Sequence, residues 1–195
     1  MTLEPENTRA EEMWDYISKS YDFRGKEVVD FGCGYGDSCI NALISGASNV
    51  IGIDNDPEMI AICGEKLSRT IKAREGKVLF ECLEIDNIVD DYSGDQLPVV
   101  MDVALCFSVL PYLLFPSSLL EIMAKYFRVS FIECQYHGDG PGLLSIKNDD
   151  DMRAWLMECG FRECVPIGFT HVDGRDKNRT IWKCVGYEDE SSEEN

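Results

Sequence analysis

The sequence lacks any long apolar run and is poor in basic residues. No stretch of about 18 uninterrupted apolar residues occurs, so we expect no membrane-spanning helix. Residues 1–6 are acidic and have no apolar core, which is not the pattern of a secretory signal. Lysine and arginine number 18 against 36 acidic residues, for a net charge of −18. Since a protein that grips a phosphate backbone normally presents a basic face, nucleic acid is disfavoured as a substrate.

Several chemical motifs are also missing. None of the nine cysteines forms a C-x-x-C pair, so the sequence does not predict a structural zinc site. The cysteines within or beside apolar runs are expected to be small buried residues: Cys33, Cys63, Cys82, Cys106 and Cys134. Unpaired thiols fit a reducing cytoplasm. Neither S-x-x-K nor H-E-x-x-H occurs, so covalent and metal-dependent hydrolysis have no motif to support them.

What the sequence does contain is a glycine-rich turn after an apolar strand. Residues 28–36 read Val-Val-Asp-Phe-Gly-Cys-Gly-Tyr-Gly, with glycines at alternate positions from Gly32 to Gly36. Glycines at the carboxyl end of a strand permit positive φ and a close approach of the backbone to a ligand. The helix expected from Asp37 would direct free N–H groups at an anion. The pattern therefore predicts a ligand-binding turn.

A second apolar run, Val50 to Ile53, ends in Asp54. A carboxylate at the end of a neighbouring parallel strand can accept hydrogen bonds from both hydroxyls of a ribose, so the two segments together predict a nucleoside site. The dinucleotide fingerprint G-x-G-x-x-G requires a third glycine where this chain has Asp37. The dinucleotide interpretation is weakened accordingly.

The run from Asp30 to Gly36, followed by Ile51-Gly52-Ile53-Asp54, resembles the first two motifs of the class I S-adenosylmethionine-dependent methyltransferases, and most of all their small-molecule branch. The resemblance implies a seven-stranded Rossmann-like α/β fold over nearly the whole chain. It also implies S-adenosylmethionine as cofactor, with S-adenosylhomocysteine as product. We therefore expect one domain over residues 1–187 and an acidic, disordered tail over 188–195.

Hydrophobic periodicity agrees with a doubly wound, mostly parallel sheet that ends in an antiparallel hairpin strand. Helices are expected at 8–20, 37–45, 57–72, 116–127 and 149–159. Strands are expected at 26–31, 49–53, 77–85, 101–107, 129–134, 162–171 and 179–187, with a polar loop after 77–85.

The resemblance also implies a set of cofactor contacts. Gly32, Gly34 and Gly36 would line the methionine part, with Asp30 near its amino group. Asp54 would hold the ribose. Asp86 and Asn87 would lie near the adenine amino group. The remaining contacts implied are Cys33, Asn55 and, at the end of the fourth strand, Cys106. Asp86 and Asn87 could instead simply begin a surface loop.

Catalytic residues are harder to assign, because the sulfonium methyl donor is already activated and a base is needed only if the acceptor must lose a proton early. His137 and Tyr112 are the catalytic candidates. They lie after the fifth and fourth expected strands, where Ser108, Gln135 and Tyr136 would also face the site.

The prediction is a cytoplasmic enzyme that transfers a methyl group to a small molecule, with no metal. The segment Ser108-Val109-Leu110-Pro111-Tyr112 lacks the Asn/Asp-Pro-Pro-Tyr of enzymes that methylate nucleic-acid amines. A protein or RNA methyltransferase, or a noncatalytic S-adenosylmethionine-binding partner, remains open as an alternative. The acceptor and the oligomeric state do not follow from the sequence.

Overall fold

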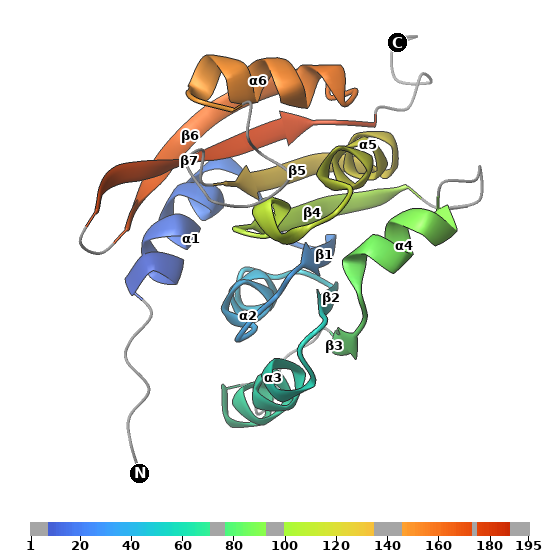
Figure 1. Cartoon of the computed structure of the whole chain (residues 1–195). Coiled ribbons are helices and arrows are strands. Elements are labelled where there is room, and N and C mark those ends of the chain that lie inside the picture. The colour runs from blue at the N-terminus through green and yellow to red at the C-terminus, as the bar shows by residue number, and fades with distance from the viewer. Residues whose placement is uncertain (1–7, 71–76, 93–99, 135–145, 173–174, 188–195) are drawn as a thin grey trace, which may run out of the picture.

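Seven strands of the described chain form a single sheet in the order β3-β2-β1-β4-β5-β7-β6 (Figure 1). The computed structural model describes residues 8–70, 77–92, 100–134, 146–172 and 175–187. The strands are β1 (Glu27–Phe31), β2 (Asn49–Asp54), β3 (Lys77–Cys82), β4 (Met101–Phe107), β5 (Phe127–Glu133), β6 (Glu163–Val172) and β7 (Arg175–Val185).

Helices cover both faces of this sheet. The helices are α1 (Thr8–Ser20), α2 (Asp37–Ile44), α3 (Pro57–Thr70), α4 (Ile85–Tyr92), α5 (Pro116–Tyr126) and α6 (Asp149–Glu158), with a short 3₁₀ turn η1 (Leu110–Tyr112). Side chains of α1, α2 and α3 share one apolar cluster with the sheet. Those of α4, α5 and α6 share the other. The central strands are therefore buried on both faces, which explains their continuous apolar runs.

The strand register places the carboxyl ends of β2, β1 and β4 side by side. Strands β3, β2, β1, β4 and β5 run parallel, and Phe31 of β1 lies between Ile53 of β2 and Cys106 of β4. The strand order reverses between β1 and β4, and ligands of doubly wound sheets bind at such a switch point. Strand β7 is antiparallel to both β5 and β6. The predicted Rossmann-like fold class is confirmed.

Three details of the prediction are wrong. The strand expected over 77–85 ends at Cys82, and the expected polar loop contains helix α4 instead. The aspartates of this helix gave it a loop-like composition, yet Ile85 and Ile88 contact the core from one face. Cys82 is exposed rather than buried.

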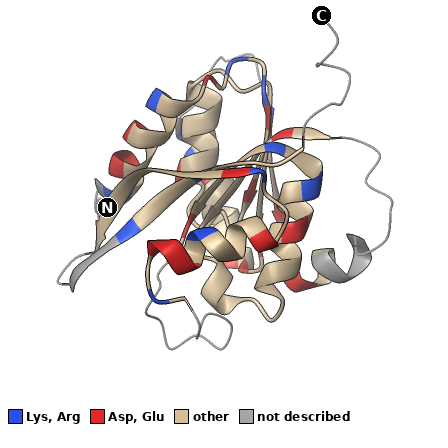
Figure 2. Cartoon of the chain, turned by 90° about the horizontal axis from the view of Figure 1, so that it is seen from above, with Lys and Arg blue, Asp and Glu red and all other residues tan. Residues whose placement is uncertain are grey.

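The acidic excess is spread over the surface. In the view of Figure 2, basic and acidic residues are interspersed over the described helices and strands. Within the described chain, no helix combines the length and the apolar character needed to cross a membrane. The expected tail, 188–195, lies outside the described residues, so the boundary at 187 stays a prediction.

Candidate functional site

The glycine turn has the backbone that its sequence predicts. Gly32, Gly34 and Gly36 all have positive φ, at 76°, 50° and 73°. Gly36 caps the amino end of α2, and Gly32 and Cys33 donate their N–H groups to the Ile53 carbonyl of the neighbouring strand. Side chains with a Cβ rarely adopt these angles, so the turn depends on glycine.

The surroundings of the three glycines differ. A Cβ on Gly32 would lie 2.2 Å from a methyl carbon of Val109, and one on Gly36 would lie 2.9 Å from the Cys63 sulfur. A Cβ on Gly34 would meet no atom within 4 Å. The outer glycines therefore allow tight packing, whereas the middle one leaves open space that a ligand can occupy.

Asp54 ends β2 and is hydrogen-bonded to the glycine turn. One carboxylate oxygen accepts the Gly34 N–H at 2.8 Å, and the other accepts the Asp56 N–H at 3.1 Å. Each oxygen has a second lone pair for a ligand hydroxyl. Asn55, beside it, is exposed and donates its side-chain amide to Glu84 at 2.9 Å.

Asp30 is buried beneath the turn, with only 2% of its surface exposed. Burial raises the pKa of its carboxyl to about 7; the Cys39 thiol, which donates a hydrogen bond at 3.3 Å, lowers this pKa, and the Asp54 carboxylate raises it. Burial likewise raises the pKa of Cys39 to about 12. Cys63 donates its S–H to the Gly34 carbonyl at 3.0 Å. The thiols beneath the turn are thus protonated supports rather than nucleophiles.

Asp86 and Asn87 begin helix α4. The Asp86 carboxylate accepts the backbone N–H groups of Leu114 and Phe115 at 3.1–3.2 Å, so it fixes the segment between η1 and α5. Asn87 is exposed. The structure therefore gives Asp86 a supporting contact, and the adenine contact expected of both residues stays a prediction.

The other expected site residues are a buried cysteine, an exposed tyrosine and residues outside the described chain. Cys106 is fully buried in the cluster with α5, so only its backbone can face a ligand. Tyr112 lies on η1 and exposes 83% of its surface. His137, with Gln135 and Tyr136, lies outside the described residues.

A polar network that the sequence did not predict lies at the carboxyl ends of β4 and β5. We call it the arginine cluster: Arg9, Ser108, Glu133, Thr170 and Arg179. The Ser108 hydroxyl accepts hydrogen bonds from Arg9 and Arg179, both at 2.6 Å, and donates one to Glu133 at 2.8 Å. The fully buried Glu133 carboxylate also accepts from Arg9 at 2.5 Å and from Thr170 at 2.9 Å.

Ser108 is held in an unusual backbone conformation. Its φ is 61°, the one positive value found among the described non-glycine residues. Its N–H donates to the Glu133 carbonyl at 2.8 Å. Such a conformation costs about 1–3 kcal/mol and persists only where surrounding contacts impose it. Glu133 could have been found as an acid ending an apolar strand, the signal that identified Asp54. Arg9 and Arg179 carry no such signal.

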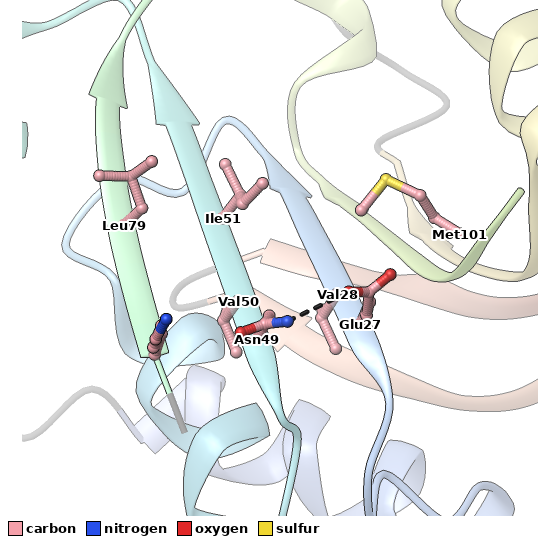
Figure 3. A pocket seen from close by; sticks show the side chains of 8 residues that line it. Glu27, Val28, Asn49, Val50, Ile51, Leu79 and Met101 are labelled. Carbon is pink, nitrogen blue, oxygen red and sulfur yellow. Dashed lines mark hydrogen bonds between the residues drawn. The ribbon is translucent and has the colours of Figure 1, made fainter. Parts of the chain in front are cut away.

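A cavity of about 250 Å³ lies at the opposite ends of the strands (Figure 3). Its lining begins with the first residues of β1, β2, β3 and β4: Glu27, Asn49, Lys77 and Met101. Ile51 and Leu79 add apolar side chains, as Figure 3 shows. Because the glycine turn is at the carboxyl ends, this cavity is separate from the candidate site.

Comparison with known proteins agrees with this geometry. The family model described as a methyltransferase domain matches residues 22–160, a span that includes the glycine turn, Asp54 and the end of β5. The chain belongs to this family. The resemblance of the glycine run to the class I methyltransferases is thereby confirmed, and the matched span extends from the segment before β1 to just beyond α6.

Curated relatives of this methyltransferase domain are named ribosomal protein L11 methyltransferase. The relative from Aliivibrio salmonicida is 37% identical over 73 residues, which is 37% of this chain and 25% of that protein. The relative from Sodalis glossinidius is 29% identical over 119 residues, 56% of this chain and 41% of that protein. The chain thus spans less than half the length of the curated relatives that it matches.

A solved structure covers the methyltransferase domain more fully. Magnesium protoporphyrin IX methyltransferase from Synechocystis PCC 6803, determined with bound S-adenosylmethionine, has a TM-score of 0.69 and 18% identity, covering 96% of this chain and 87% of that one. A putative RNA methyltransferase from Pyrococcus horikoshii has a TM-score of 0.58 and 18% identity, covering 93% and 83%. At these identities the likeness establishes the fold.

Proposed function

We propose that this chain transfers a methyl group from S-adenosylmethionine to a small-molecule acceptor. The cofactor assignment rests on the glycine turn, which is hydrogen-bonded to Asp54, in a chain that belongs to the methyltransferase domain family. When bound, S-adenosylmethionine would supply a methyl group attached to a sulfonium sulfur. An acceptor atom would bond to the methyl carbon as the carbon–sulfur bond opposite it breaks, which leaves S-adenosylhomocysteine.

The residues present fit that cofactor. Open space above Gly34 leaves room for the methionine part against the backbone. Asp54 would accept the ribose hydroxyls with its free lone pairs, as Asp30 would accept the ammonium group from below the turn. The other contacts proposed are Gly32, Cys33, Gly36, Asn55, Asp86, Asn87 and the backbone of Cys106. The chain itself contributes orientation and exclusion of water rather than an activated nucleophile.

A small acceptor is favoured because little structure beyond the sheet and its helices surrounds the site. Among the described residues, no inserted domain interrupts the order of helices and strands, and Arg9 of α1 reaches Ser108 at the carboxyl end of β4. His137 and Tyr112 remain the proposed proton-transfer residues. Free cysteines throughout the described chain suit a reducing compartment, so we also propose a cytoplasmic location.

A protein acceptor is the second candidate, because the curated relatives are named for ribosomal protein L11. A protein substrate would need an open groove over β4 and β5. Methylation assays with purified ribosomal protein L11 and with small-molecule pools would separate the two acceptor classes, since only one should incorporate labelled methyl groups.

The cofactor assignment is tested by calorimetric titration of the full chain with S-adenosylhomocysteine and with NAD. We expect the first to bind and the second not to. Asp54→Ala should weaken S-adenosylhomocysteine binding by about 1–3 kcal/mol, because the ribose loses its charged acceptor. Asp22→Ala removes the same charge from an exposed ion pair with Arg24 and should leave the affinity unchanged.

Other outcomes of that titration have clear meanings. If NAD alone binds, the methyltransferase proposal is wrong. If neither ligand binds to folded protein, the chain is a noncatalytic interaction module that retains the fold.

A further inference from the structure

The two edges of the sheet differ in how they are protected. Strands β3 and β6 are outermost, at opposite ends of the strand order (Figure 1). In β6, Pro166 interrupts the strand, the pairing with β7 shifts at two places, and Glu12 of α1 accepts the His171 N–H at 3.2 Å. Prolines, bulges and a covering helix are features by which natural sheets prevent a further strand from adding to an edge. The β6 edge is therefore protected against such pairing.

Strand β3 is a regular edge strand. It contains no proline and pairs with β2 without a shift in register. Leu83, just after the strand, donates its N–H to the Asp54 carbonyl of β2 at 2.9 Å. Because the backbone groups of alternate residues point to opposite sides of a strand, those of the even-numbered residues of β3 point away from β2. Among the described residues, none forms a hydrogen bond with these outward groups of Val78, Phe80 and Cys82.

One face of β3 carries a symmetric set of side chains. Lys77, Leu79 and Glu81 alternate along the strand and therefore share this face. Leu79 exposes 51% of its surface, Lys77 is exposed and Glu81 is half-buried. Lys77 and Leu79 also line the cavity of Figure 3, where Leu79 lies beside Ile51 of β2. An exposed apolar side chain is thus flanked by a cation on one side and an anion on the other.

A second copy of β3 fits this edge in an antiparallel register. When the two strands are centred on Leu79, Lys77 of each copy faces Glu81 of the other, and the two Leu79 side chains meet between these pairs. Opposite charges directly across an antiparallel pair attract, and like charges there repel. These pairs are of the non-hydrogen-bonded kind, in which the side chains lie closest. The charges on this face are therefore self-complementary about Leu79.

The same register also satisfies the backbone. Val78 of each copy lies opposite Phe80 of the other. Both residues have outward N–H and C=O groups, so they exchange hydrogen bonds. Moving the centre by one residue, to Phe80, places Lys77 opposite Leu83 and removes both ion pairs. Charge and hydrogen bonding together favour the register centred on Leu79.

We propose that two copies of this chain associate through β3, antiparallel about a twofold axis at Leu79, so that their sheets join into one. The interface is isologous, because each copy contributes the same surface. It is small, with a strand of six residues from each copy, and it joins two molecules of net charge −18. The dimer is therefore weak, and it is stronger when salt screens the repulsion between the copies. The proposal does not depend on the proposed methyltransferase function.

Sedimentation equilibrium of the full chain tests the association. We would measure it between about 1 and 500 µM in about 0.15 M sodium chloride, where the screening length is about 8 Å. We expect the average mass to rise with concentration from that of the 22.0 kDa monomer toward twice that value. A mass that stays at the monomer value throughout overturns the proposal.

Charge reversals test the register. Lys77→Glu and Glu81→Lys should each weaken dimerisation about tenfold or more, because each change makes both symmetry-related pairs repulsive. The variant that carries both changes regains both attractions, so it should dimerise within about threefold of the wild type. Lys19→Glu and Glu65→Lys change the charge equally at exposed helix positions and should alter dimerisation by less than about twofold.

A mixture of the two single variants separates pairing from folding. Lys77→Glu in one copy and Glu81→Lys in the other place opposite charges across both pairs. The mixed dimer should therefore form at least as well as the wild type, while each variant alone stays mainly monomeric. Because mixing recovers the association, its loss in either variant alone cannot come from misfolding. Mixing the Lys19→Glu and Glu65→Lys proteins should produce no such gain.

Two further outcomes overturn the proposal. If the wild type and all the charge variants dimerise equally, the interface lies elsewhere on the molecule. If neither the double variant nor the mixture recovers what the single variants lose, Lys77 and Glu81 do not face each other across a twofold axis.

Discussion

At the scale of single residues, the Asp30 carboxyl is almost fully buried within the candidate site. It lies beneath the glycine turn, hydrogen-bonded to the Cys39 thiol and close to the Asp54 carboxylate. Because its pKa is raised to about 7, about half of the unliganded protein carries a proton there near pH 7. Binding of a cationic ammonium group above it would favour release of that proton.

Asp30 should therefore make stability depend on pH. Between its ordinary pKa of 3.8 and its folded value of about 7, the folded chain holds a proton that the unfolded chain has lost. The free energy of unfolding consequently falls as pH rises through this window. Asp30→Asn removes this titrating carboxyl. The free energy of unfolding of the variant, relative to that of the wild type, should therefore increase by about 2–3 kcal/mol from pH 5 to pH 8.

Urea unfolding of both proteins at several pH values measures this difference. The contributions of the other titrating groups to the free energy of unfolding cancel between the two proteins. A difference that does not change with pH would show that the Asp30 carboxyl ionises normally in the folded protein.

At the scale of elements, Tyr16 of α1 packs closely on Gly168 of β6. A Cβ on Gly168 would lie 2.4 Å from ring atoms of Tyr16. This contact occurs at an irregularity in the pairing of β6 with β7, between Pro166 and Gly168. The position of α1 matters for the site because α1 carries Arg9.

Gly168→Ala should therefore displace α1. We expect a loss of about 1–3 kcal/mol in the free energy of unfolding, the usual cost of overpacking, together with weaker hydrogen bonds from Arg9 to Ser108 and Glu133. Denaturant unfolding measures the first effect, and a shift of the Arg9 Nε–H resonance in NMR spectra measures the second.

Gly64→Ala is the matched control, because the space around Gly64 in α3 is open. It should preserve or raise stability, since alanine favours a helix. If Gly168→Ala behaves like Gly64→Ala, the contact with Tyr16 does not place α1.

Sequence patterns predicted most elements and the donor side of the site, because both depend on local features. Alternating glycines and an acid that ends an apolar strand are visible in a short window. Helix α4 was not predicted, because its aspartates give the segment a polar composition and only Ile85 and Ile88 mark its apolar face. The arginine cluster was missed because Arg9, Glu133 and Arg179 meet only through the strand order and the docking of α1.

At the scale of the whole molecule, the net charge of −18 opposes compact folding. Exposed acidic side chains repel one another over distances that salt screens, since the Debye length falls from about 10 Å at 0.1 M to about 3 Å at 1 M. The folded state brings these charges closer together than the unfolded state does.

Added sodium chloride should therefore raise the melting temperature by several degrees between 0.02 and 0.5 M, approximate bounds that span most of this screening. Scanning calorimetry measures the change, and a neutral osmolyte of matched osmolality is the control. A melting temperature that falls with salt would mean that surface ion pairs, such as Lys19 with Asp15, outweigh the repulsion.

The position of β7 has a consequence for synthesis of the chain. It lies between β5 and β6 although it follows both in the sequence, so β6 cannot join the sheet until residues 175–185 have emerged from the ribosome. Until then β5 is an unpaired apolar edge, which is prone to aggregation. Arg179 arrives on the same strand, so a nascent chain can form its glycine turn first and complete its arginine cluster only after β7 has been synthesised.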